Sequence, residues 1–178
     1  MFQLKLTTKD KIMAVISIVL VVLLVVGGRV VASRFVFSYT NSVGYRFFKR
    51  VKCPPVIPRW QFLEVIPNSE DPFVPHVGWM HLIKKAGCLP GETVVRRGLD
   101  FWCPTPEGLQ IGLGRTKLKA RDGRPLVPYT YGSGPEARIK IRNGSIFVVG
   151  DLQPHCYDSR YFGPIPRERV FSCLKPLF

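Results

Sequence analysis

The sequence predicts a mostly β fold, in which an antiparallel β domain follows one N-terminal transmembrane helix. Residues 12–28 form an uncharged apolar run. Beyond residue 33 the apolar residues fall in short runs rich in β-branched and aromatic side chains. The 16 glycines and 16 prolines punctuate those runs. Either a β sandwich or a partly open barrel is compatible with this pattern.

The apolar run can cross a membrane as one helix. Val30, Val31 and Ala32 extend it, and a helix rising about 1.5 Å per residue needs roughly 20 apolar residues to cross about 30 Å of hydrocarbon. Arg29 can snorkel to one interface. A cleaved signal peptide is the alternative, and residues 31–33 resemble a cleavage site. Its apolar stretch is shorter, about 7 to 15 residues, so we expect a retained anchor.

Basic residues before the run predict its orientation. Lys5, Lys9 and Lys11 precede it, and Asp10 is the only acidic residue among them. The positive-inside tendency keeps such a terminus in the cytoplasm. We therefore expect residues 1–33 to be a short cytoplasmic N-terminus and anchor, and residues 34–178 to be an extracytoplasmic β domain.

The chain is strongly basic, with 26 Lys and Arg against 12 Asp and Glu and a formal net charge of +14. Such a charge suits nucleic acid or the anionic surface of a bilayer. The basic residues are scattered along the chain, and no nucleic-acid motif is present. Because an anchor is also present, we expect anionic lipid as a partner and no nucleic acid.

Four short runs are the clearest strand candidates: residues 59–66, 79–83, 92–95 and 145–149. Pro90 and Gly91 lie between the second and third runs. Pro-Gly is a strong turn signal, so we expect the strand that carries Lys84 to form a hairpin with the run that follows. Residues 98–136 are rich in Gly, Pro and basic residues, and we expect them to form the least regular part of the β domain, an extension with short strands and turns.

The five cysteines predict one or two disulfides and one buried thiol. An odd number leaves at least one thiol unpaired within the chain in an oxidising compartment. The spacing lacks the Cys-x-x-Cys pairs of a zinc site, and the three histidines are not grouped as ligands, so we expect no metal. The cysteines are Cys53, Cys88, Cys103, Cys156 and Cys173.

Ser42 and Lys84, if they meet, make this chain a serine hydrolase with no catalytic histidine. A serine hydroxyl is a poor nucleophile until a base takes its proton, and a lysine made neutral by burial can be that base. Lys84 lies on an expected strand, an environment able to remove water from an ammonium. Lys85 should point the other way, into solvent, because successive strand residues face opposite sides. The alternatives are a turn serine and an ordinary exposed lysine.

A third polar block, Asp158-Ser159-Arg160, lies near the C-terminus and is flanked by aromatic residues. Asp158 can pair with Arg160 and hold the loop that surrounds the lysine. Asp151, which follows Gly150, is expected as a turn residue or a cap.

These three blocks occur in the order and at about the spacings of the bacterial type I signal peptidases. The serine block is SVGYRFF at residues 42–48, and the lysine block is IKKAGCLPGE at residues 83–92. The third is GD at 150–151 followed by DSRYFG at 158–163. The chain most resembles the conjugative-transfer peptidases of the TraF type, and the resemblance covers almost all of it outside residues 98–136.

The resemblance implies a membrane-anchored serine endopeptidase that forms an acyl-enzyme and uses no cofactor. Ser42 would be the nucleophile and Lys84 the general base, while Asp158 and Arg160 would order the site. Thr40 is a possible side-chain donor to the oxyanion. The substrate would be a secreted or membrane-tethered precursor protein such as a conjugative pilin, released as a linear or cyclic product. The chain would be a single-pass protein of the bacterial inner membrane with its catalytic domain in the periplasm.

Three positions differ from the usual residues of that family. Many relatives have proline where this chain has Gly44, often serine where it has Cys156, and aspartate where it has Glu92. These differences concern the turn after the serine and the groups that orient the lysine.

Two other function classes compete with the peptidase. The first is a non-enzymatic, membrane-anchored assembly factor of a conjugation or secretion apparatus, with the basic β domain as a docking surface. The second is a self-cleaving repressor of the LexA type. That repressor requires a cytosolic DNA-binding domain where this chain has its membrane segment.

Overall fold

A computed structural model of the chain describes residues 7–39, 42–66, 73, 81–120, 122–151 and 156–178. The chain divides into two compact units, Met1–Val36 and Phe37–Phe178. We refer to the second as the β unit.

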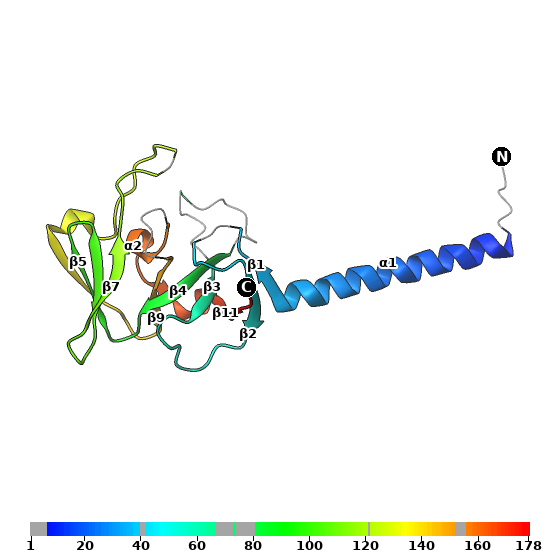
Figure 1. Ribbon diagram of the computed structural model, residues 1–178, viewed down its shortest axis with the longest axis horizontal. Coiled ribbons are helices and arrows are strands. Elements are labelled where there is room, and N and C mark those ends of the chain that lie inside the picture. The colour runs from blue at the N-terminus through cyan, green and yellow to red at the C-terminus, as the bar shows by residue number, and fades with distance from the viewer. Residues whose placement is uncertain (1–6, 40–41, 67–72, 74–80, 121, 152–155) are drawn as a thin grey trace. The chain divides into compact units, whose positions relative to one another are not determined.

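The first unit is built on one long helix, α1 (Thr8–Arg34), drawn in blue in Figure 1. A capping box starts it: the Asp10 N–H donates to Thr7 Oγ1 at 3.3 Å, and the Thr7 N–H donates to the Asp10 carboxylate at 2.9 Å. None of its residues is buried. Among the described residues, α1 is the one helix long and apolar enough to cross a membrane.

The described residues of the β unit form two sheets, and every strand pairing described in register is antiparallel. This confirms the mostly β, antiparallel fold predicted from the sequence. The larger sheet has the order β1-β2-β11-β3-β4-β9-β10. Its strands are β1 (Phe35–Phe37), β2 (Phe47–Val51), β3 (Phe62–Val65), β4 (Leu82–Cys88), β9 (Ser145–Val149), β10 (Ile165–Pro166) and β11 (Val170–Pro176).

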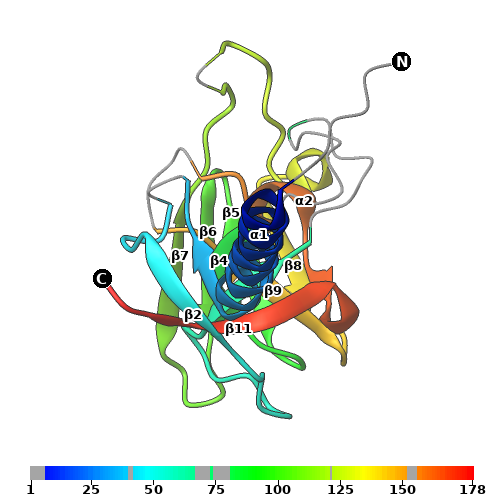
Figure 2. The ribbon, with the colours of Figure 1, turned by 90° about the vertical axis from the view of Figure 1, so that its right-hand side faces the viewer.

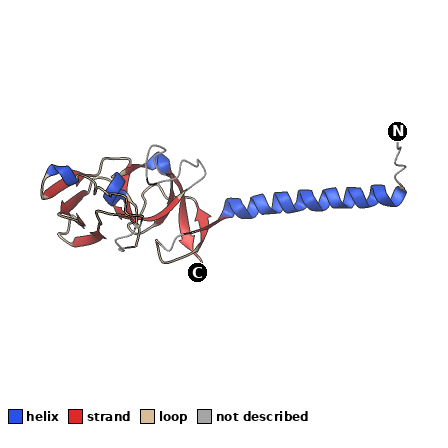
Figure 3. Ribbon diagram, turned by 90° about the horizontal axis from the view of Figure 1, so that it is seen from above, coloured by secondary structure: helices blue, strands red, loops and turns tan. Residues whose placement is uncertain are grey.

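The smaller sheet has the order β7-β6-β5-β8. Its strands are β5 (Thr93–Arg97), β6 (Asp100–Pro104), β7 (Gln110–Arg115) and β8 (Glu136–Lys140). In the part of the β unit that the structure describes, helical structure is limited to short segments, as Figure 3 shows. They are the 3-10 turns η1 (Tyr131–Ser133) and η2 (Arg167–Arg169) and the single-turn helix α2 (Ser159–Phe162).

Strand β9 faces two hydrophobic cores at once. Ile146 and Val148 pack into a core that also contains Leu63 of β3, whereas Phe147 and Val149 pack into a second core under the smaller sheet. Because strand side chains alternate between faces, a run apolar at every position is buried on both sides. The continuous apolar sequence of β9 therefore places it between the two cores.

The Pro90-Gly91 turn forms, but the predicted hairpin does not. The Glu92 N–H donates to the Leu89 carbonyl at 3.1 Å, and Gly91 has a φ of 84°, which this turn requires at that position. However, β4 pairs with β3 along one edge and with β9 along the other, so no edge is left for β5. The turn instead carries the chain from the larger sheet into the smaller one.

The segment 98–136 contains short strands joined by turns. It supplies β6 and β7, which pair with each other and with β5, so it forms half of the smaller sheet. Irregular structure is confined mainly to the connection between β7 and β8. Figures 1 and 2 show that this connection extends away from the strands as a long arm.

The cysteine prediction is confirmed. Cys53 is bonded to Cys173 and Cys88 to Cys103, while Cys156 keeps a buried free thiol. The first disulfide joins the loop after β2 to β11. The second joins β4 to β6 and therefore links the two sheets.

Candidate active site

Lys84 lies in the interior of the larger sheet. It is the third residue of β4, opposite Leu63 of β3, and only 4% of it is exposed. Burial lowers the pKa of Lys84 below its ordinary value, against the opposing attraction of Asp158. A lysine in this environment is closer to the neutral form that can accept a proton.

Lys85 does not simply face solvent, contrary to the prediction. Its Nζ lies 2.5 Å from Asp151 Oδ1 and 5.2 Å from the centroid of the Phe62 ring. The alternation of the strand does turn it away from Lys84, but that face of β4 carries an acidic loop residue and an aromatic ring. Asp151 is therefore the partner of a half-buried lysine rather than only a turn residue.

Asp158 and Arg160 form the predicted pair, and both side chains are fully buried. Arg160 Nη2 donates to Asp158 Oδ2 at 2.7 Å and Nε donates to Oδ1 at 2.9 Å. The Gly150 N–H also donates to Asp158 Oδ2, at 2.8 Å. The carboxylate thus fastens the end of β9 to the start of α2.

The segment 98–136 supports this buried pair from outside. Arg160 Nη1 donates to the Arg115 carbonyl at 3.3 Å, and the Lys117 N–H donates to the Tyr161 hydroxyl at 2.8 Å. The Tyr129 N–H donates to the Arg160 carbonyl at 2.7 Å. Both ends of the arm are therefore bonded to the Asp158 to Tyr161 turn.

Ser42 lies in the bend that precedes β2, and its backbone is held by residues that also act on the lysine. The Asp151 N–H donates to the Ser42 carbonyl at 2.5 Å, and Cys156 Sγ donates to the same oxygen at 3.7 Å. Asp151 and Cys156 both interact electrostatically with Lys84. The serine block, the lysine block and the third block thus meet in one region of the β unit.

Gly150 and the Cys156 thiol are small enough to let the chain after β9 approach the Ser42 carbonyl. A Cβ added at Gly150 would lie 2.6 Å from Cys156 Sγ and 3.1 Å from the Ser42 carbonyl oxygen. Burial raises the pKa of Cys156, so its thiol stays protonated and can donate to Ser42. Position 150 therefore needs glycine where the two loops cross.

Gly44 takes a backbone conformation that proline cannot adopt. Its φ is 76°, and a Cβ at this position would lie 3.1 Å from Asp151 Oδ2. Proline fixes φ near −65°. The turn after Ser42 is therefore built differently from one that carries proline.

The Gly44→Pro variant is expected to lose about 1–3 kcal/mol of unfolding free energy or more, because the loop must leave its present conformation. Thermal unfolding of the detergent-solubilised chain measures this loss. Gly132→Ala is the control, since a Cβ there meets nothing within 4 Å. Wild-type stability in Gly44→Pro would contradict the described turn.

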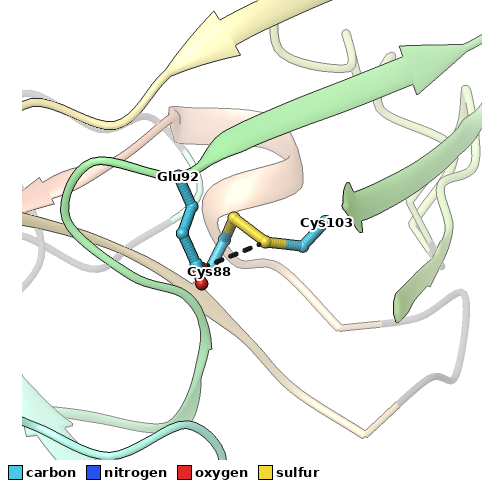
Figure 4. Close-up of side chains that lie close together, drawn as sticks. All are labelled: Cys88, Glu92 and Cys103. Atoms are coloured by element: carbon cyan, nitrogen blue, oxygen red, sulfur yellow. Dashed lines mark hydrogen bonds between the residues drawn. A yellow bond between two sulfur atoms is a disulfide. The ribbon is translucent and has the colours of Figure 1, made fainter. Parts of the chain in front are cut away.

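Cys88, Glu92 and Cys103 converge closely enough to resemble a metal-binding group (Figure 4). Their ligand atoms are already engaged. The two sulfurs form a disulfide, and Glu92 pairs with Arg59 and accepts from the Leu89 N–H at 2.6 Å. Metals bind thiolates rather than disulfide sulfur, so these residues do not fit a metal in this state.

Of the predicted site residues, Ser42, Lys84, Asp158 and Arg160 lie among the described residues, and Thr40 lies outside them. The sequence did not predict the ion pair between Lys85 and Asp151. It also did not predict the hydrogen bond that the Tyr161 hydroxyl accepts. The DSRYFG block contains Tyr161, but nothing in the sequence indicates that its hydroxyl meets the backbone of Lys117, which lies 44 residues earlier.

Comparison with known proteins identifies the family of the chain. The family model for signal peptidase, peptidase S26, matches residues 65–175, more than half of the chain. The match includes Lys84, Asp158 and Arg160 and begins after Ser42. No curated protein matches the chain.

Among solved structures, the chain is similar to a signal peptidase I from Enterococcus faecalis V583. The identity is 21%, and the match covers 70% of this chain and 100% of that one, with a TM-score of 0.37. On the family match, the chain belongs to the signal peptidase family, peptidase S26.

Proposed function

We propose that this protein is a membrane-anchored serine endopeptidase in which Ser42 and Lys84 act as a nucleophile and base pair on a precursor protein. One observation carries the proposal: the residues that bond to the Ser42 carbonyl also act on a lysine that is 4% exposed. Membership of the peptidase S26 family supports a peptidase, and the apolar helix α1 fits a membrane-anchored protein.

In the proposed reaction, neutral Lys84 takes the proton of Ser42 as Oγ attacks the scissile carbonyl. The Ser42 N–H would donate to the oxyanion, with the Thr40 hydroxyl as a second donor. The lysine then gives its proton to the leaving amine, and an acyl-enzyme remains on Ser42. A water molecule, deprotonated by Lys84, releases the acyl group.

The buried Asp158 and Arg160 would act as positioning residues. Their side chains are fully buried, so they are not placed to contact substrate directly. Asp158 attracts the protonated form of Lys84 and fixes Gly150, whose neighbour Asp151 binds the Ser42 carbonyl. The pair would thereby set the relative position of nucleophile and base.

The substrate in this proposal is a secreted or membrane-tethered precursor, and a conjugative pilin is the specific candidate. Three lysines before the apolar run of residues 12–28 favour a cytoplasmic N-terminus, which would place the β unit in the periplasm of a bacterium. The precursor would bind as an extended strand along an exposed sheet edge. Either water or the substrate's own amino terminus could take the acyl group, giving a linear or a cyclic product.

The test is co-expression of the chain with a secreted pilin precursor from the same operon, followed by intact mass measurement of the product. Wild type is expected to release a shortened protein, and a product lighter by one further water identifies cyclisation. Ser42→Ala should leave the precursor intact, whereas the exposed Ser133→Ala should match wild type. Equal processing with and without Ser42 would refute the proposed function.

A further inference from the structure

A large cavity lies away from the candidate active site. It has a volume of about 810 Å³, within the range of small-molecule sites, and its walls come from the β4–β5 turn, the loop after β2 and the segment after β6. Among the lining residues, Leu89 is the one that directly follows β4 in the chain. At about 3.3 Å per strand residue, Leu89 lies roughly 16 Å along the chain from Lys84. The cavity shares none of its lining residues with the proposed catalytic site.

The lining is mostly apolar and offers few backbone hydrogen bonds. Four of its residues are prolines, which have no N–H: Pro55, Pro90, Pro104 and Pro106. Its strand residues in β5, β6 and β9 belong to strands that are paired along both edges. Arg138 of the edge strand β8 is the register partner of Val95, which also lines the cavity, so the cavity lies against a face of the smaller sheet. A peptide could therefore not bind at this face by adding a strand, and an acyl chain, which needs no backbone partner, fits better.

Two arginines supply the positive charge of this cavity. Arg167 donates through Nη2 to the Pro54 carbonyl at 3.1 Å, while its Nη1 is buried with no hydrogen-bond partner among the described residues. Arg138 is exposed and pairs with Glu136 at 3.3 Å. The acidic lining residue Glu92 is already paired with Arg59. A buried donor without a partner is unfavourable, and Arg167 lines the cavity, so an anionic group bound beside its guanidinium would supply an acceptor.

We propose that this cavity binds a single-chain anionic lipid, with its acyl chain against the prolines, Ile57 and Ile146 and its carboxylate or phosphate at Arg167. The head group gains a charge-assisted hydrogen bond, and the chain buries apolar surface. The membrane that holds such an anchored protein contains anionic lipids. The site does not depend on the peptidase chemistry.

The experiment uses the full chain in nanodiscs of neutral phosphatidylcholine and three photoreactive probes with identical twelve-carbon chains. The probes end in a carboxylate, a phosphate or an uncharged alcohol, and cross-linked peptides are mapped by mass spectrometry. We expect either anionic probe to label peptides containing residues 55–57 or 104–106, about tenfold or more above the alcohol. Preference for the carboxylate identifies a fatty acid, and preference for the phosphate identifies a lysophospholipid-like ligand.

Arg167→Gln should reduce this labelling about tenfold, whereas Arg97→Gln, an exposed arginine outside the cavity, should not. Val56→Trp is a second variant that fills the cavity from a residue 79% exposed, so it leaves the core intact. Labelling confined to α1, equal labelling by the alcohol, or full labelling in both variants would overturn the proposal. So would stronger labelling of the cavity by an apolar photoreactive peptide.

Discussion

The Lys84→Met variant is expected to cleave precursor roughly 10²- to 10⁴-fold more slowly than wild type, the usual range for loss of a general base. Methionine keeps the length and the apolar stem of the side chain but cannot accept the proton of Ser42. Initial rates of precursor cleavage measure the effect. Lys140→Met, at an exposed position on β8, is the matched control and should retain the wild-type rate.

The same variant should change how stability depends on pH. Because burial lowers the pKa of Lys84 in the folded chain, the unfolded chain binds more protons between that lowered pKa and the ordinary value of about 10.4. Wild-type stability should therefore rise with pH through this window, and this contribution should be missing in Lys84→Met. Cleavage by wild type should rise with pH as Lys84 loses its proton.

Thermal unfolding and cleavage rates at a series of pH values test both expectations together. Full activity in Lys84→Met would exclude Lys84 as the base. An activity profile that falls where Lys84 becomes neutral would contradict its proposed protonation state.

The Asp158→Asn variant is expected to lose about 3–5 kcal/mol of unfolding free energy, the typical result of breaking a buried ion pair. Arg160 would then carry a buried charge without its carboxylate, and both side chains are fully buried. Burial lowers the pKa of Arg160, and in wild type the attraction and hydrogen bonding of Asp158 more than offset this effect. An arginine does not lose its proton in a protein, so the variant keeps a buried charge. Denaturant unfolding of the solubilised chain measures the loss.

Asp122→Asn is the control for this second prediction. Asp122 also pairs with an arginine, Arg124, at 2.7 Å, but both side chains are more than half exposed. Surface pairs contribute little, so no measurable destabilisation is expected. If Asp158→Asn were as stable as Asp122→Asn, the buried pair would not hold the site together.

The sequence predicted the features that depend on local pattern. The uncharged run lies within α1, the predicted run 59–66 contains β3 at 62–65, and the predicted run 145–149 is β9. The Pro90-Gly91 turn also formed as predicted. These features follow from residues that are neighbours in the chain.

The failures concern partners that are distant in the chain. The Pro-Gly signal fixes a turn but does not say that both edges of β4 are already taken by β3 and β9. Strand alternation correctly predicts that Lys85 points away from Lys84. It does not predict that Lys85 contacts Asp151 and the Phe62 ring on that face of β4. Long-range pairing decides both outcomes, and no local pattern encodes it.

In the candidate site, too, contacts between residues close in the chain were predictable and contacts between distant residues were not. Asp158 and Arg160 are two residues apart, so their pairing was predictable from the sequence. The bond between Tyr161 and Lys117 spans 44 residues, and the bond from Cys156 to Ser42 spans 114. Those contacts depend on how the two sheets pack, which is why the role of segment 98–136 emerges only from the structure.

The most direct test of the central claim is to trap the acyl-enzyme. A peptide ester is a suitable substrate, because its alcohol leaving group departs readily and leaves deacylation as the slow step. Rapid acid quenching, digestion and mass spectrometry should find the acyl group on Ser42 in wild type and none in Lys84→Met. Turnover with no adduct on Ser42, or with the adduct on another residue such as Cys156, would contradict the account.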